Sequence, residues 1–188
     1  PQRAYGRLSW IAFLLTMAVL IALALRLQVV WQRIHLSEFS LFQLGGDEID
    51  YETLARDLLR GSFFEKPWRV PVYPMFIAAI YFILEARSPE GLLYIQAFLG
   101  VAPVLLTYFL ARRITNAAPA LAAAGIVALD TLLIDHAKLV YAEVLYTPLL
   151  LISLLALLWA LESPRLSRFA WAGASMAVAT LCRPTAAI

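Results

Sequence analysis

The residues of this chain best suited to chemistry are acidic, and they cluster at Asp47, Glu48 and Asp50. Carboxylates at the start of a helix can simply cap its free N–H groups and complement its dipole. Three of them within four positions exceed what capping needs, and a carboxylate held at a membrane surface can act as a general base or bind a metal ion. Capping and catalysis are compatible, since a cap fixes the position of the group. We therefore take Asp47 and Glu48 as candidate catalytic residues.

A basic and aromatic stretch follows at 65–74 and contains Lys66, Trp68, Arg69 and Tyr73. The two cations could extend to lipid headgroups, with Trp68 and Tyr73 as anchors at the membrane interface. Alternatively, Lys66 and Arg69 bind a phosphate, to which the planar guanidinium of arginine is well suited. Lys66, Arg69 and Tyr73 are therefore candidate substrate-binding residues.

A third group of ionisable residues lies at 130–143. Charged groups at membrane depth are functional candidates by default, which makes Glu143 another candidate catalytic residue. His136 either rests at the water boundary or shares a divalent metal ion with Asp47, because imidazole and carboxylate suit several such ions. The spacing fixes no coordination geometry, so the cofactor is left open. Arg183, near the end of the chain, is either a headgroup contact or a further substrate-binding residue that holds phosphate.

Composition indicates that a membrane protein presents these groups. Of the 188 residues, 62% are hydrophobic and 15% are charged, against roughly 45–50% and about 25% in soluble domains. A soluble globular domain is therefore excluded. The formal net charge is only +2 and the basic residues are scattered, which argues against nucleic-acid binding. Cys182 is the single cysteine, so the chain has no internal disulfide.

Five stretches are apolar and about long enough to cross a membrane as helices. They are 9–25, 92–111, 117–134, 144–161 and 169–188. A sixth stretch, 70–84, is shorter and carries Pro71 and Pro74 near its start, which favours a re-entrant or interfacial helix. The prediction is an all-α polytopic bundle that forms a single transmembrane domain. Because the chain opens without Met and ends inside a hydrophobic stretch, we expect it to be the N-terminal part of a longer protein.

The arginines predict the orientation of this bundle. If 70–84 does not cross the membrane, one side has six arginines and the short loop on the other side has only Lys138. If it does cross, the two sides carry equal numbers of basic residues. The six are Arg3, Arg7, Arg112, Arg113, Arg165 and Arg168. The positive-inside rule favours the first arrangement. It makes the N-terminus cytoplasmic and places two loops outside, a long one at 26–90 and a short one around 135–143.

The long loop contains a predicted amphipathic helix at 47–60. Its apolar positions follow the spacing of one helix face, and they are Tyr51, Leu54, Ala55, Leu58 and Leu59. Asp47 stands where an N-cap would and Gly61 where a helix would stop. Such a helix should lie in the headgroup plane and hold Asp47 at the membrane surface.

In this order, the pieces resemble the GT-C superfamily of integral-membrane glycosyltransferases. The likeness is to the branch that includes protein O-mannosyltransferases and the aminoarabinose transferases that modify lipid A. The matching residues are Asp47-Glu48, Tyr51, Leu54-Ala55, Leu58, Arg69-x-Pro71-x-Tyr73-Pro74, Gln96, Gly100, Tyr108, Ala111-Arg112-Arg113, Glu143 and Arg183-Pro184. No one motif is decisive, but their order covers nearly the whole chain.

The resemblance implies a polyprenyl-phosphate sugar donor whose anomeric carbon is attacked with inversion outside the membrane. It implies that Asp47 is the general base and that Arg69 holds the donor phosphate, while Glu143 occupies a second acidic position and Tyr51 joins the substrate-binding residues. The aminoarabinose branch has a Lys-Pro-Pro run where Trp68 and Arg69 intervene here, which favours Arg69 over Lys66. The expected location is a bacterial inner membrane, as a multi-pass protein among membrane lipids.

Two other functions stay open at this point. The chain could be a non-catalytic subunit or scaffold of a larger membrane complex, since it is too short for the second half of the GT-C fold that binds the acceptor. It could also be a transporter fragment, but its ionisable groups cluster at one face rather than at a midplane site. The sequence does not identify the sugar or the acceptor.

Overall fold

The structure is a computed structural model that describes residues 2–36, 44–62, 69–85 and 88–183, with side chains from Trp10 onward. All regular elements in these ranges are helices, which confirms the predicted all-α membrane bundle. In chain order they are α1 (Gln2–His35), α2 (Asp47–Leu59), α3 (Val72–Leu84), α4 (Glu90–Leu99), α5 (Ala102–Ile114), α6 (Ala117–Leu129), α7 (Thr131–His136), α8 (Glu143–Glu162) and α9 (Leu166–Cys182).

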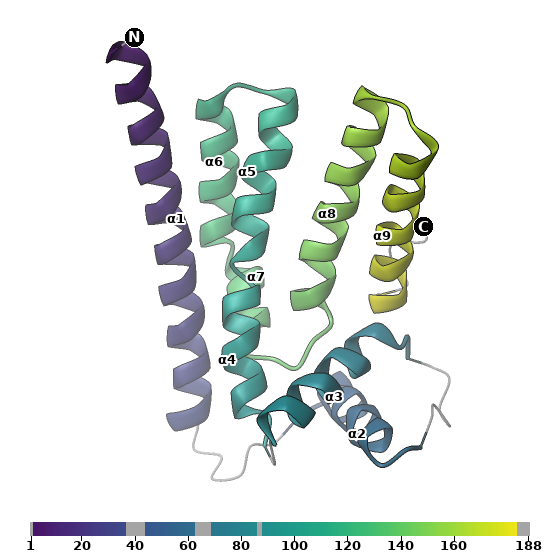
Figure 1. Ribbon diagram of the computed structural model, residues 1–188. Coiled ribbons are helices and arrows are strands. Elements are labelled where there is room, and N and C mark those ends of the chain that lie inside the picture. The colour runs from purple at the N-terminus through teal and green to yellow at the C-terminus, as the bar shows by residue number, and fades with distance from the viewer. Residues whose placement is uncertain (1, 37–43, 63–68, 86–87, 184–188) are drawn as a thin grey trace.

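The long helices run side by side, and the two helices of the first loop lie across one end of them (Figure 1). We call this the α2–α3 end; the last turns of α1, the 137–142 segment and the first turn of α8 belong to it as well. The N-terminus and the links after α5 and α8 lie at the opposite end. There, Arg113 and Glu162 form an ion pair of 2.5 Å. After passing along α1 and back along α4 and α5, the chain is again at the end of the bundle that holds the N-terminus.

Three helical stretches of the described residues are long and apolar enough to span a membrane. They are Trp10–His35, Glu90–Ile114 and Glu143–Glu162. The first extends beyond the predicted span at 9–25, and its additional turns pack Leu27, Val30 and Ile34 against the core. Residues 26–35, expected at the start of the first loop, are therefore helical.

Two other predicted spans have different helix bounds in the described residues. The 117–134 stretch divides at Asp130, which is extended and whose carboxylate accepts a hydrogen bond from the Leu133 N–H at 3.0 Å, so that it caps α7. The 169–188 stretch begins earlier, in α9 at Leu166, and its residues 184–188 lie outside the described ranges.

Arg26, on α1, has a fully buried side chain. It lies beside Gly100, which follows α4 and precedes α5. Its guanidinium donates to the carbonyl of Ala22 at 3.0 Å and to that of Ala128 at 3.5 Å. Ala128 is in the last turn of α6, whose carbonyls have no partner within the helix. Gly100 leaves room for this arginine, since a Cβ there would be 3.1 Å from Arg26 Nε.

Replacing Gly100 by alanine should therefore destabilise the fold. The added methyl would lie 3.1 Å from Arg26 Nε, so the buried arginine must shift to make room, and such overpacking costs roughly 1–3 kcal/mol. Thermal unfolding in detergent would measure the change. Gly125→Ala is the matched control, because nothing lies within 4 Å of a Cβ there and a helical alanine is more stable than glycine by up to about 1 kcal/mol. Equal stability of the two variants would contradict the packing that we describe.

The α2–α3 pair is held together by aromatic and charged contacts. The rings of Tyr51 and Tyr73 pack edge to face, with centroids 4.8 Å apart. Glu52 accepts hydrogen bonds from the Tyr81 hydroxyl and from Arg56 Nε, the latter at 2.8 Å. The predicted apolar face of α2 points into this contact, except for Leu59 at its end, which is exposed. These contacts fix α2, and with it Asp47 at its first position, relative to α3.

Candidate functional site

Asp47 is the first residue of α2 and its carboxylate is exposed, which corrects the expectation that it caps the helix. Gly46 holds the cap position, with a φ of 54° that favours glycine, and no side chain caps the helix there. Asp47 instead binds Arg69 through both oxygens, at 2.5 and 3.3 Å. With 57% of its side chain exposed, this carboxylate is open to a substrate.

Arg69 is fixed by three neighbours on α2. Besides Asp47, its guanidinium binds Asp50 at 3.0 Å and lies 5.0 Å above the ring of Tyr51. The hydrogen bond with Asp47 and then that with Asp50 raise the pKa of Arg69 further above its usual range, against the opposing effect of burial. The buried Nε–H of Arg69 has no hydrogen-bond partner among the described residues. The arginine is therefore a rigid cation, held on α2 by its two Nη groups.

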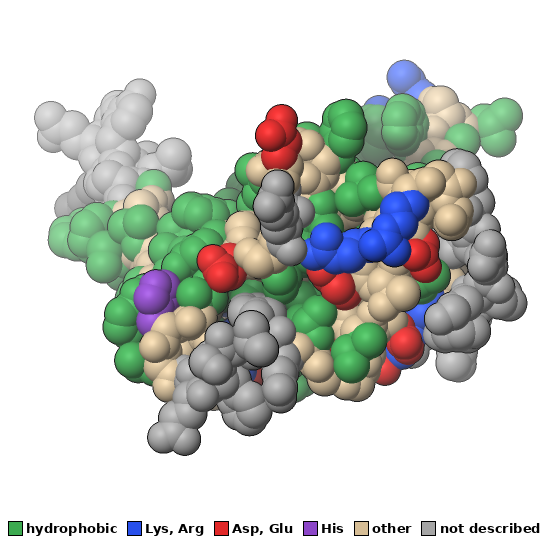
Figure 2. Space-filling model, turned by 90° about the horizontal axis from the view of Figure 1, so that it is seen from below, with side chains coloured by type: hydrophobic (Ala, Val, Ile, Leu, Met, Phe, Trp, Pro, Cys, Tyr) green, Lys and Arg blue, Asp and Glu red, His purple; other side chains and the backbone are tan. Residues whose placement is uncertain are grey.

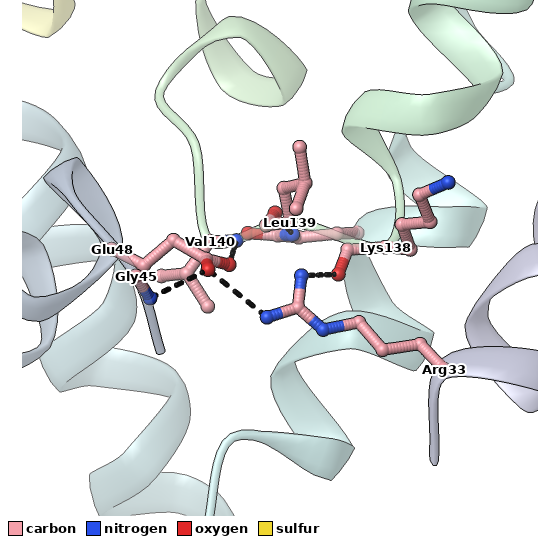
Figure 3. Close-up of polar contacts among 7 residues, drawn as sticks. Arg33, Gly45, Glu48, Lys138, Leu139 and Val140 are labelled. Carbon is pink, nitrogen blue, oxygen red and sulfur yellow. Dashed lines mark hydrogen bonds and ion pairs between the residues drawn. The ribbon is translucent and has the colours of Figure 1, made fainter. Parts of the chain in front are cut away.

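Glu48, which we expected to be catalytic, is buried and only 4% exposed. Its Oε2 accepts from Arg33 at 3.0 Å and from the Gly45 N–H at 3.2 Å. Its Oε1 accepts from the Val140 N–H at 2.8 Å (Figure 3). Both oxygens are thus engaged by protein donors, and this geometry favours a positioning role.

Glu143 and Arg183 form a second ion pair, at 2.5 Å, between the start of α8 and the residue after α9. Charges from both this pair and the Asp47–Arg69 pair act on the Tyr51 hydroxyl. Burial raises the pKa of the Tyr51 hydroxyl; the charge of Arg69 opposes this, while the charges of Glu143 and Asp47 add to it. Both carboxylates therefore act on one phenol, although each has its own arginine.

The remaining predicted substrate contacts are less accessible or lie elsewhere. Tyr73 is fully buried and donates to Gln96 Oε1 at 2.5 Å, so it packs inside the α2–α3 end rather than facing a substrate. Tyr51 is also buried and serves as the platform under Arg69. Lys66 falls outside the described residues.

The suggested metal pair, Asp47 with His136, has no third ligand in the described part of the chain. No group of three or more His, Cys, Asp or Glu side chains there could hold a metal ion. His136 and Glu143 instead line a small cavity of about 10 Å³, close to the minimum that one water molecule needs. The buried Nδ1 of His136 has no hydrogen-bond partner among these residues.

Three residues of the site were not identified from the sequence in these roles: Arg33, Asp50 and Gln96. Arg33 was assigned to a loop, and the signal that could have found it is the helical spacing of Leu27, Val30 and Ile34, which continue one apolar face of α1. Gln96 was part of the family pattern without a role, and an amide inside a predicted span is itself a signal of a buried partner. Asp50 was noted in the acidic cluster, one helical turn after Asp47.

Acidic and basic side chains lie among apolar ones on the face of the α2–α3 end (Figure 2). A family model described as dolichyl-phosphate-mannose-protein mannosyltransferase matches residues 65–188, most of the chain. The chain belongs to this family. It is therefore an integral-membrane glycosyltransferase of the GT-C superfamily, mannosyltransferase-like in type, and its family uses a lipid-linked sugar donor.

The match to the mannosyltransferase family covers one part of the site. Arg69, Glu143 and Arg183 lie within the matched residues, whereas Asp47 and the rest of α2 precede them. No curated protein and no solved structure matches the chain. What marks Asp47 as a site residue is its contact with Arg69 and its exposure.

Proposed function

We propose that the protein transfers one sugar from a polyprenyl-phosphate donor to a hydroxyl group of an acceptor, with inversion at the anomeric carbon. The observation that carries this is the pairing of Asp47, an exposed carboxylate, with Arg69, a rigid cation. The acceptor oxygen attacks the anomeric carbon and forms the new glycosidic bond. The bond from that carbon to the phosphate oxygen breaks, polyprenyl phosphate leaves with the electron pair, and Asp47 takes the proton of the hydroxyl.

Arg69 is the residue that we assign to the donor phosphate. Its planar fork suits two phosphate oxygens, and 21% of its side chain is exposed. Without donor, however, the same guanidinium holds both oxygens of Asp47. A donor phosphate therefore competes with Asp47 for Arg69, and Asp50 can keep the arginine in place meanwhile. Binding of the donor then frees Asp47 to accept a proton.

We place the α2–α3 end outside the cytoplasm. The segments that contain the six arginines of the positive-inside argument lie at the opposite end of the bundle, and arginines near the ends of membrane helices favour the cytoplasm. Asp47, Arg69 and Glu143 then face the extracytoplasmic side. The N-terminus is cytoplasmic in this arrangement.

The intact protein in lipid vesicles tests this function. Polyprenyl-phosphate mannose with a labelled sugar is supplied together with a peptide rich in Ser and Thr. We expect labelled product, release of polyprenyl phosphate, and an anomeric configuration by NMR opposite to that of the donor. Retained configuration would contradict the single displacement step. An intact protein that neither binds nor consumes the donor would support the non-catalytic subunit instead.

Arg69→Lys should weaken binding of the donor. A lysine cannot bind two phosphate oxygens as a fork, and a hydrogen bond to a charged group contributes about 1.5–3 kcal/mol, or about ten- to a hundredfold in Kd. Titration of the purified protein with polyprenyl phosphate would measure it. Arg60→Lys is the control, because Arg60 is an exposed arginine at the end of α2, paired only loosely with Asp57 at 3.7 Å. Unchanged affinity in Arg69→Lys would place the phosphate elsewhere.

A further inference from the structure

The segment between α7 and α8 is held by side chains from three other helices. Residues 138–140 each use one backbone group for this, and the three partners come from α1, α4 and α2. The bonds are Arg33 Nη1 to the Lys138 carbonyl oxygen (2.5 Å), Gln96 Nε2 to the Leu139 carbonyl oxygen (2.7 Å) and the Val140 N–H to Glu48 Oε1 (2.8 Å). Figure 3 shows Arg33 reaching between Glu48 and the Lys138 carbonyl. We call Arg33, Glu48 and Gln96 the 138–140 clamp.

The members of the clamp are also bonded to other side chains. Arg33 Nη2 binds Glu48 Oε2 at 3.0 Å, and Gln96 Oε1 accepts from the Tyr73 hydroxyl at 2.5 Å. Glu48, Gln96, Tyr73 and Val140 are all buried. In surroundings of low dielectric, a satisfied polar network strongly favours one geometry, because each broken bond leaves a buried group unpaired. The clamp therefore defines one position for residues 138–140.

This position matters for the two carboxylates of the site. Glu48 directly follows Asp47 at the start of α2, and Val140 lies three residues before Glu143 at the start of α8. The Glu48–Val140 bond thus connects the backbone at one carboxylate with the backbone at the other. Tyr141, in the segment between them, reflects this proximity: burial raises the pKa of its hydroxyl, and the charges of Glu48, Asp47 and Glu143 add to the effect.

We propose that Arg33 and Gln96 are positioning residues for sugar transfer, which act by holding residues 138–140 and so set Glu143 relative to Asp47. This inference rests on the proposed function. Neither side chain contacts the Asp47–Arg69 pair in the described structure, so the clamp acts on the rate of transfer and leaves donor binding to Arg69. Misplacement of a reacting group by about 1 Å can cost on the order of a hundredfold in rate.

The test compares Gln96→Glu and Arg33→Lys with the wild-type intact protein in vesicles. Gln96→Glu keeps the size of the side chain but replaces the donor to the Leu139 carbonyl by an oxygen. Arg33→Lys keeps the charge but cannot reach both Glu48 and Lys138 as a fork. We expect kcat per folded molecule to fall about tenfold or more in each, with the Kd for polyprenyl phosphate within about twofold. Gln32→Glu is the matched control, an exposed glutamine beside Arg33, and should keep the wild-type kcat.

The outcomes separate the clamp from the function itself. A wild-type kcat in the folded fraction of both variants, with only a lower Tm, would overturn the positioning role and leave the stability role. A loss of donor affinity matching the loss of rate would also overturn it. If Asp47→Asn retains full activity, the proposed function fails whatever the clamp variants do. If Asp47→Asn is inactive while both clamp variants are normal, the clamp proposal alone fails.

Discussion

Asp47→Asn should lower the rate of sugar transfer by roughly 10²–10⁴-fold, the range typical of the loss of a general base. An asparagine amide cannot take the proton of the acceptor hydroxyl. It also holds Arg69 less strongly than a carboxylate does, since the charge-assisted pair at 2.5 Å is lost. The Kd for polyprenyl phosphate should therefore stay equal or become lower. Steady-state transfer assays and donor titrations on the same preparation measure both quantities.

The matched control for this change is Asp57→Asn. Asp57 lies on the same helix and loses the same charge, but its partner is the exposed Arg60 at 3.7 Å. We expect wild-type kcat and wild-type donor affinity in this variant. A fall in kcat of equal size in both variants would show that the charge of α2, rather than the carboxylate of Asp47, governs the rate.

Glu48→Ala should have the largest effect on stability. It leaves the Arg33 guanidinium and the Val140 N–H without their carboxylate. Breaking a buried ion pair by removing one partner costs about 3–5 kcal/mol, and we expect about 3 kcal/mol because part of Arg33 remains exposed. Unfolding of the purified protein in detergent, followed by circular dichroism, would show the loss.

Glu162→Ala provides the comparison for an exposed pair. Glu162 binds Arg113 at 2.5 Å, closer than Glu48 binds Arg33 at 3.0 Å, but both Glu162 and Arg113 are exposed. Exposed pairs contribute about 0–1 kcal/mol, so this variant should unfold close to the wild type. If Glu48→Ala were no less stable than Glu162→Ala, Glu48 would not be the buried connection between α1, α2 and residues 138–140.

The acidic cluster and Arg69 could be found from the sequence because their residue types are rare in a chain that is 62% hydrophobic. The roles within the cluster could not be separated in the same way. Successive residues of a helix point about 100° apart, so Asp47 is exposed and Glu48 is buried although they are adjacent. Which of the two faces the interior depends on α1 and on residues 138–140, which are distant in sequence.

The limits of the membrane helices show the same dependence on distant contacts. We predicted that the first span ends at Leu25, but α1 continues to His35 with Arg26 buried against Gly100 and the Ala128 carbonyl. Periodicity describes one helix at a time and cannot indicate a partner on another helix. Composition and periodicity were sufficient for the all-α bundle and for the amphipathic α2, since both are local properties of the chain.

The position of the donor phosphate is the most direct test of the site. A cryo-EM structure of the intact protein with polyprenyl phosphate should show the phosphate on the Arg69 guanidinium, with Asp47 separated from that arginine and open to the acceptor side. A phosphate bound away from Arg69, with both oxygens of Asp47 still on the guanidinium, would contradict the assignment of Asp47 as base and Arg69 as phosphate ligand.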